Sequence, residues 1–238
     1  MSDVKFCADL HLGHKGVERF RPIFKNTTDH DEKITENVIS SVGKNDDLWV
    51  LGDVCFNKES FHYFKDIVNS VRRVNVVLGN HDFERKSAPS IDDYLGCGNV
   101  NVFGMVKYKG FWLTHCPVHD TELRGRWNVH GHNHDVLVQD FRYINVSMEQ
   151  INYKPVSLVD IQNIATNRKN IVQRQINNDI VTYLGAIGKS HLSLGTVDDV
   201  LSSEELTAAD KYILKSILLS DRSDLYKSLA KQYFGEVS

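Results

Sequence analysis

Val-Asn-Val-Val-Leu-Gly-Asn-His-Asp, residues 74–82, joins an apolar run to a group of polar side chains through one glycine. The apolar run at residues 74–78 predicts a buried strand, and the polar side chains follow at the point where that strand ends. Several strands of this kind indicate a sheet that is covered on both faces. The same arrangement occurs twice earlier in the chain, in residues 4–8 before Asp9 and in residues 48–51 before Gly52 and Asp53.

Residues 31–42 and 61–71 lie between these strands, and each has apolar side chains at helical spacing. Strands that alternate with helices indicate an α/β core. Further along, four short apolar segments with little helix between them predict a second, largely antiparallel sheet that packs on the first. The expected fold is therefore α/β, a two-sheet β-sandwich flanked by helices. The four segments are residues 99–106, 110–114, 127–129 and 142–146.

The pattern becomes helical after about residue 160, so we expect a core over residues 1–160 and a helical C-terminal extension over residues 161–238. Bracing of the core is the expected role of this extension, because apolar helix faces must be buried against something. Several side chains suggest its helices: Thr196 and Asp199 as a capping pair, Ile213, Ile217 and Leu218 on one apolar face, and Leu225, Leu229 and Tyr233 on another.

Composition limits the class of protein. The chain has 238 residues, 41% hydrophobic and 25% charged, and a formal net charge of -3, so no basic surplus signals a nucleic-acid binder. We find neither an apolar run long enough for a membrane helix nor a secretion signal. Cys7, Cys55, Cys97 and Cys116 form no CxxC pair, so reduced thiols and a cytoplasmic location are expected.

Metal-binding residue types gather at the ends of the predicted strands, where open α/β sheets place their ligands. Carboxylate and imidazole donors together suit Mn²⁺, Fe²⁺, Zn²⁺ or Ni²⁺. A carboxylate can bridge two such ions about 3.5–4 Å apart, and the ions acidify a water between them. The series therefore predicts a two-metal centre. Its five elements are Asp9-Leu10-His11, Gly52-Asp53, Gly79-Asn80-His81-Asp82, Thr114-His115 and Gly131-His132-Asn133-His134.

The series resembles the calcineurin-like metallophosphoesterase superfamily, whose pattern is DxH, GD, GNH(D/E), H and GHxH, and no motif position is substituted. The stretches DLHLGHKGVERFRPIF, HDEKITENV and LWVLGDVCF further resemble small bacterial and phage phosphoesterases. The match spans residues 3–160. It implies the two-sheet sandwich of that family and two divalent ions, with Mn²⁺ preferred and Fe, Zn or Ni as alternatives.

The resemblance also implies a role for each motif residue. Asp9, His11, Asp53 and His134 would hold the first metal, and Asp53, Asn80, His115 and His132 the second, with Asp53 bridging. His81 would protonate the leaving oxygen, and Asp82 would orient His81. His130 and His132 could also be read as an alternating pair, but the family's His-x-His after glycine selects His132 and His134 and leaves His130 as a packing residue.

Other polar residues have ordinary interpretations. His14 either contacts substrate or is exposed on its loop, and the remaining histidines are surface or packing residues. Cys116 is interpreted as a reduced packing thiol. Arg124 and Arg126 could clamp a second phosphate, but a solvated loop pair is favoured slightly.

The leading hypothesis is a dinuclear metal-dependent phosphoesterase in which metal-bound hydroxide attacks a phosphodiester or phosphomonoester. The expected substrate is a small, nucleotide-like phosphoester; nucleic acid stays open but is not signalled by charge. No membrane partner is expected, and self-association through the extension stays open. The alternative is a metal-binding scaffold or interaction module of the same fold with little turnover.

Overall fold

The first sheet has five strands in the order β4-β3-β2-β1-β9. The computed structural model, which describes residues 2–194 and 197–219, pairs the first four strands in parallel and sets β9 antiparallel to β1. The carboxyl ends of the four parallel strands therefore meet at one edge. Their bounds are β1 (Val4–Cys7), β2 (Asp47–Leu51), β3 (Arg73–Val77), β4 (Val100–Phe103) and β9 (Val156–Ser157).

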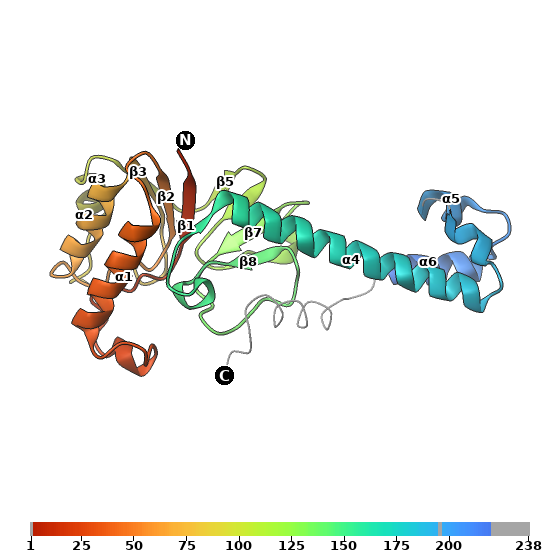
Figure 1. The fold of residues 1–238 in the computed structure, drawn as a ribbon, viewed down its shortest axis with the longest axis horizontal. Coiled ribbons are helices and arrows are strands. Elements are labelled where there is room, and N and C mark those ends of the chain that lie inside the picture. Colours follow the sequence, from red (N-terminus) through yellow and green to blue (C-terminus); the bar gives the residue numbers. More distant parts are fainter. Residues whose placement is uncertain (1, 195–196, 220–238) are drawn as a thin grey trace. The chain divides into compact units, whose positions relative to one another are not determined.

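Alternate side chains of β2 bury the two faces of this sheet. Leu48 and Val50 join a cluster with the helices that cover one face. Trp49 and Leu51 join a second cluster with the other sheet. Because both faces are buried, the strand is a continuous apolar run rather than an alternating one. Figure 1 shows the helices α1 (Thr27–Ser41), α2 (Phe61–Ser70) and α3 (Ile91–Leu95) on the outer side of the first sheet.

The second sheet has the order β5-β6-β7-β8, and the prediction that it is largely antiparallel is wrong. Only β5 and β6 pair antiparallel, whereas β6 with β7 and β7 with β8 pair in parallel. Residues 99–106 also do not form one strand, since β4 belongs to the first sheet and β5 to the second. The bounds are β5 (Val106–Tyr108), β6 (Phe111–Leu113), β7 (Trp127–His130) and β8 (Tyr143–Asn145).

The helix predicted over residues 31–42 begins earlier, at Thr27, because the Asn26 side chain accepts a hydrogen bond from the backbone of Asp29 and caps it. Helix α3, which the sequence analysis did not predict, begins with a capping box between Ser90 and Asp93. Short 3-10 segments complete the loops: η1 (Val17–Arg19), η2 (Asp120–Glu122) and η3 (Met148–Ile151).

The described residues divide into two units between Ala165 and Thr166. We call the residues before this division the core unit and the described residues after it the C-terminal unit. Helix α4 (Leu158–Ala186) begins in the core unit, where Ile161 and Ala165 pack with the second sheet.

The C-terminal unit is helical and has a hydrophobic cluster of its own. Besides the end of α4 it contains η4 (Ser190–Leu194), α5 (Val197–Ser202) and α6 (Ala208–Leu219). Thr207 and Asp210 exchange hydrogen bonds at the start of α6 and cap it. The buried members of its cluster are Ile180, Leu184, Val200, Leu206 and Leu214.

The protein is thus α/β, with two packed sheets flanked by helices and a helical C-terminal part. Among the described residues, no helix combines the length and apolarity that crossing a bilayer requires. Two expectations for the extension lie outside the described residues: the cap at Thr196 and the helix containing Leu225, Leu229 and Tyr233.

Candidate metal centre

Each predicted site residue lies just beyond the carboxyl end of a strand in the core unit. Asp9 and His11 follow β1, Asp53 follows β2 and Asn80 follows β3. His115 follows β6, and His132 and His134 follow β7. The structure brings most of these residues into two groups whose donor atoms lie within 4.8 Å of one another: Asp9, His11 and His134, and Asp9, Asp53 and His115.

Two glycines allow these side chains to approach the backbone closely. A Cβ atom built on Gly79 would lie 2.2 Å from Oδ1 of Asp53, and one built on Gly131 would lie 2.5 Å from Oδ2 of Asp9. No side chain fits at such distances, so both positions require glycine. The glycines of the GNH and GHxH motifs therefore make room for the two carboxylates.

Four of the predicted ligand residues have a left-handed backbone conformation. The φ angles are 59° at Asp9, 53° at His11, 53° at Asp53 and 69° at His132. Such a conformation costs on the order of 1–3 kcal/mol in a residue other than glycine, and it persists only where the surroundings impose it. Strain of this kind concentrated in one place is typical of a functional site.

The first donor group centres on the buried carboxylate of Asp9. Nε2 of His11 and Nε2 of His134 each lie 3.7 Å from its Oδ1 atom. Among the described residues, Oδ1 of Asp9 and Nε2 of His11 are buried without a hydrogen-bond partner. Buried polar atoms are nearly always satisfied, so this pair is explained by a cation that both atoms would coordinate.

Asp53 belongs to the second donor group and also approaches a histidine of the first. Its Oδ2 atom is 3.5 Å from Nε2 of His11 and 3.3 Å from Nε2 of His115. Oδ1 of Asn80 lies 2.9 Å from the same nitrogen of His115. The geometry thus gives one carboxylate access to donors from both groups, as a bridging ligand needs.

The imidazoles are oriented so that one nitrogen of each faces the site. Nδ1 of His115 donates to the Leu51 carbonyl at 2.8 Å, which leaves Nε2 toward Asp53 and Asn80. Nδ1 of His134 donates to Oε1 of Glu149 at 2.8 Å, which leaves Nε2 toward Asp9. A hydrogen bond to the outer nitrogen is the usual means of fixing the tautomer of a metal-binding histidine.

The electrostatics of the group favour positive charge. Burial opposes the charged form of His115, but hydrogen bonding to Asp53 and the charges of Asp9 and Asp53 raise the pKa of His115 to about 9. Burial likewise opposes ionisation of Asp53, yet the imidazoles of His11 and His115 beside it hold the pKa of that carboxyl well below its usual range. Donors that favour a proton on His115 also suit a metal cation, which would bring positive charge to the same place when it replaces that proton.

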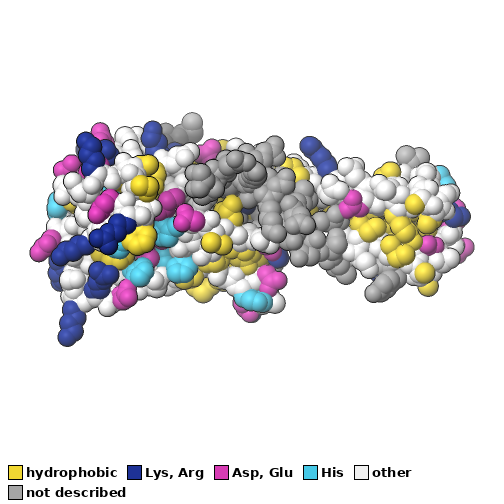
Figure 2. Space-filling model, turned by 90° about the horizontal axis from the view of Figure 1, so that it is seen from below, with side chains coloured by type: hydrophobic (Ala, Val, Ile, Leu, Met, Phe, Trp, Pro, Cys, Tyr) yellow, Lys and Arg dark blue, Asp and Glu magenta, His cyan; other side chains and the backbone are white. Residues whose placement is uncertain are grey.

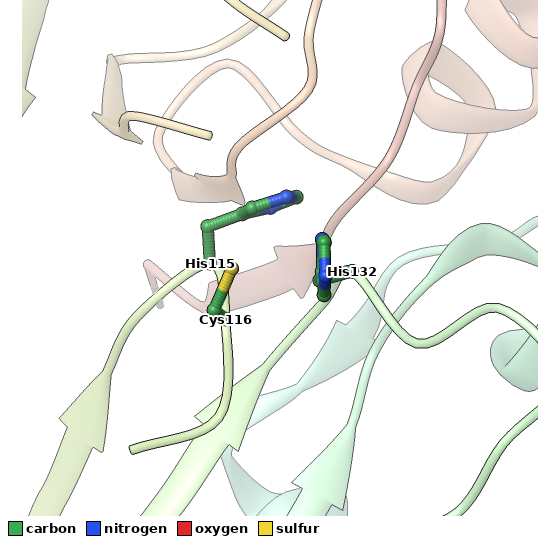
Figure 3. Close-up of side chains that lie close together, drawn as sticks. All are labelled: His115, Cys116 and His132. Carbon is green, nitrogen blue, oxygen red and sulfur yellow. The ribbon is translucent and has the colours of Figure 1, made fainter. Parts of the chain in front are cut away.

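His132 lies at the exposed side of the centre. Its backbone N–H donates to Oδ2 of Asp9 at 2.9 Å, and its ring centroid is 5.1 Å from that of His115. Cys116 lies beside both rings, and the three residues offer donor atoms within 4.8 Å of one another (Figure 3). We expected a packing thiol at Cys116, but the residue is exposed because it follows His115 out of the sheet edge.

The expected role of Asp82 as the partner of His81 needs correction. The buried carboxylate of Asp82 instead accepts hydrogen bonds from the backbone N–H groups of Asp53, Val54 and Gly79, at 3.1, 2.8 and 2.7 Å. Nδ1 of His81 pairs with the carboxylate of Glu84. Asp82 therefore shapes the loops that carry the donors, and Glu84 is the carboxylate that contacts the imidazole of His81.

A buried network behind the first donor group was missed by sequence reasoning. The Arg21 side chain is 1% exposed; it donates to Oε1 of Glu149 at 2.7 Å and to the carbonyl of Asp9 at 2.7 Å. Nη1 of Arg21 also lies 2.8 Å from Nε2 of His30, whose Nδ1 is 2.8 Å from Asp31. Arg21, His30 and Asp31 lie in stretches that resemble small phosphoesterases, but the resemblance did not predict their contacts. Glu149 is 128 residues from Arg21 in sequence.

The remaining polar residues lie around this centre or away from it. The His14 ring centroid is 5.7 Å from that of His11, so His14 borders the site. His130 is buried and donates from Nδ1 to the Gly131 carbonyl at 2.8 Å, as a packing residue would. Arg124 is exposed and pairs with Glu122 at 3.1 Å, which agrees with a solvated loop. Figure 2 shows several histidines together on one face, with Lys and Arg beside them.

The sequence is similar to those of a phage protein and a protein from Methanocaldococcus jannaschii. No family model matches the chain. The gene 66 protein of Mycobacterium phage L5 is 36% identical over 84 residues, which span 34% of this chain and 41% of that protein. An uncharacterized protein of Methanocaldococcus jannaschii is 28% identical over 192 residues, which span 75% of this chain and 98% of that protein.

One solved structure has a similar fold. A protein of unknown function from Aquifex aeolicus superposes with a TM-score of 0.55 at 20% identity, over 69% of this chain and 100% of that one. At this identity the likeness shows a shared fold.

Proposed function

We propose that this protein is a metal-dependent phosphoesterase that binds two divalent ions, with Mn²⁺ preferred. The observation that carries the proposal is the position of Asp53, whose Oδ2 atom lies 3.5 Å from a nitrogen of His11 and 3.3 Å from a nitrogen of His115. One carboxylate between two sets of imidazole, carboxylate and amide donors is the arrangement that a pair of ions requires. The motif series from Asp9 to His134, which resembles the calcineurin-like metallophosphoesterase pattern, supports the same function.

The donors divide into two sets in this proposal. Asp9, His11 and His134 would hold one ion and Asn80, His115 and His132 the other, with Asp53 shared. The unsatisfied atoms of Asp9 and His11 fit such an ion, as does the oxygen- and nitrogen-rich donor set. When bound, divalent ions acidify water and offset the negative charge that develops on the phosphoryl oxygens.

His81 is proposed to protonate the leaving oxygen. Its backbone N–H donates to Oδ1 of Asp53 at 2.9 Å, so its position depends directly on the carboxylate at the middle of the centre. Its ring centroid lies 6.2 Å from that of His11, and Nδ1 is held by Glu84. Nε2 is thereby left as the nitrogen that can present a proton to substrate, a task suited to imidazole near neutral pH.

The test is hydrolysis of bis-p-nitrophenyl phosphate and p-nitrophenyl phosphate by the full chain, with added Mn²⁺ and after chelation. We expect turnover that requires metal and about two ions per chain by elemental analysis. Comparison of the two substrates separates a diesterase from a monoesterase. Two bound ions without turnover of either substrate would instead support a metal-binding scaffold of the same fold.

A further inference from the structure

A cationic cavity lies beside the candidate metal centre. It has a volume of about 350 Å³, and three loops contribute to its lining. Lys15 comes from the loop after β1, Lys58 from the loop after β2 and Arg85 from the loop after β3. All three loops leave the sheet at the edge that carries the metal donors, so the topology directs these cations to one place.

The charge of this cavity contrasts with that of the whole chain. The chain has a formal net charge of -3, yet three cationic side chains and one acidic side chain, Glu59, line the cavity. Lys58 is paired with Asp93 at 2.8 Å. In the part of the chain that the structure describes, Lys15 and Arg85 have no such ion pair, so their charges are available to a ligand. Two cations without an ion pair in one concave site attract an anion.

Phe56 connects this cavity to the catalytic residues. The guanidinium carbon of Arg85 lies 5.3 Å from the centroid of the Phe56 ring. The same ring is 5.2 Å from the ring of His81 and 5.0 Å from that of His11. Arg85 and His81 therefore pack against the same aromatic ring, so one small molecule can reach both side chains.

We propose that this cavity binds a second phosphate of the substrate. The inference rests on the proposed phosphoesterase function and narrows it to phosphodiesters that carry a further phosphate near the scissile one, as a nucleotide with phosphates on two of its hydroxyls does. Arg85 is the main contact, because its guanidinium fits phosphate oxygens in a two-point arrangement. Lys15 adds a second positive charge from the loop after β1.

The experiment compares two chromogenic substrates that differ only in the second phosphate. These are the p-nitrophenyl ester of thymidine 5′-phosphate and the same ester with a 3′-phosphate. One charge-assisted hydrogen bond corresponds to about a tenfold effect, so we expect kcat/KM to be about tenfold higher for the 3′-phosphorylated ester. Arg85→Ala should remove this difference, and Lys15→Ala should reduce it.

Matched variants separate this effect from general damage. Lys86→Ala removes an exposed charge next to Arg85 that does not line the cavity, and it should leave the difference intact. Arg85→Lys should retain part of it. Lys86→Ala should not change kcat/KM for bis-p-nitrophenyl phosphate by more than about twofold. Arg85→Ala should lower kcat/KM for that substrate less than it lowers kcat/KM for the 3′-phosphorylated ester, since bis-p-nitrophenyl phosphate has no second phosphate.

Binding measured without turnover keeps the two proposals apart. Calorimetric titration of the full chain with thymidine 3′,5′-bisphosphate should give a dissociation constant about tenfold lower than with thymidine 5′-phosphate, and Arg85→Ala should abolish that preference. Equal affinity for the two nucleotides in the unmodified chain would overturn the second-phosphate site, whatever the activity. If the unmodified chain hydrolyses none of the esters but still prefers the bisphosphate in the titration, the phosphoesterase proposal alone is overturned.

Discussion

The carboxylate of Asp82 holds the backbone of Asp53: its Oδ2 atom accepts the Asp53 N–H at 3.1 Å, and both side chains are buried. The other oxygen accepts the N–H of Val54 at 2.8 Å. A side chain that follows β3 thus fixes the turn that follows β2. This arrangement gives Asp53, the residue between the two donor groups, a defined position before any ion binds.

Asp82→Ala should therefore lower both stability and metal binding. The buried N–H groups of Asp53 and Val54 and the partly buried N–H of Gly79 would lose their acceptor, and leaving a buried donor unsatisfied costs about 1–3 kcal/mol each. We expect the free energy of unfolding to fall by about 3 kcal/mol or more, measured by urea denaturation. Asp66→Ala, an exposed change on α2, serves as the control. A variant with unchanged stability and only a lower kcat would restore the role of orienting His81.

Asp53→Asn should remove nearly all activity and release metal from both positions. The amide keeps the shape of the side chain but lacks the charge, and it offers only one oxygen to the donors near His11 and His115. We expect a loss of at least about 100-fold in kcat/KM, since even outer partners of metal ligands contribute 10–100-fold. Elemental analysis counts the bound ions, with Asp92→Asn on α3 as the control. Retention of two ions at full occupancy would argue against a shared carboxylate.

His81→Ala should keep the metal and slow hydrolysis. Losing a general acid costs on the order of 10²–10⁴-fold, and esters with poor leaving groups should suffer most because nitrophenolate leaves without needing a proton. The measurement compares kcat for methyl and p-nitrophenyl esters of one phosphate. If the variant loses an ion, His81 is a ligand and the assignment of its role is wrong.

Glu149→Gln should weaken metal binding without touching the donors themselves. Burial opposes ionisation of Glu149, but hydrogen bonding with His134 and the charge of Arg21 lower the pKa of Glu149 to about 2, so it is a carboxylate at neutral pH. Loss of the negative charge loosens the orientation of His134 and leaves the Arg21 guanidinium without its ion pair. We expect metal affinity to fall about 10–100-fold by chelator competition. Glu122→Gln, an exposed change at the end of η2, should leave metal affinity unchanged.

His130 predicts a pH dependence of stability. Burial lowers the pKa of His130 from 6.5 to about 4, so the unfolded chain takes up a proton before the folded one does. The stabilisation is complete above about pH 6.5 and is lost as the pH falls toward 4, and linkage gives a loss of about 2 kcal/mol at pH 5. Urea denaturation at pH 7 and 5, with chelator present, should show a smaller decrease in His130→Asn. An equal decrease in both proteins would refute this assignment.

Strands β1, β2 and β3 and the donor positions at their ends were predictable, because their apolar runs end just before Asp9, Asp53 and Asn80. Strand β4 was instead expected in the second sheet, and β9 was not predicted. Strands buried on both faces leave a strong local signal, and parallel pairing brings their ends together. The direction of β7 was not predictable. The sequence of a strand of three or four residues does not indicate its direction. The direction of β7 depends on the path of residues 114–126, which connect it to β6.

The partners of the donors could not be predicted for a different reason. Arg21 and Glu149 are 128 residues apart in sequence, so no local spacing predicts their contact. The resemblance implied that Asp82 orients His81, whereas the fold turns the Asp82 carboxylate toward the backbone of Asp53. Buried hydrogen bonds of this kind depend on the tertiary structure alone.

The left-handed backbone at Asp9, His11, Asp53 and His132 has a consequence for the order of assembly. The energy to hold these residues there comes from the packed sheets beneath, so folding should precede metal binding. In a zinc finger, by contrast, the ion supplies the folding energy. We therefore expect chelation to leave a folded apoprotein that can be reloaded with a different ion, so that the metal carried in a cell reflects which ions are supplied to a finished protein.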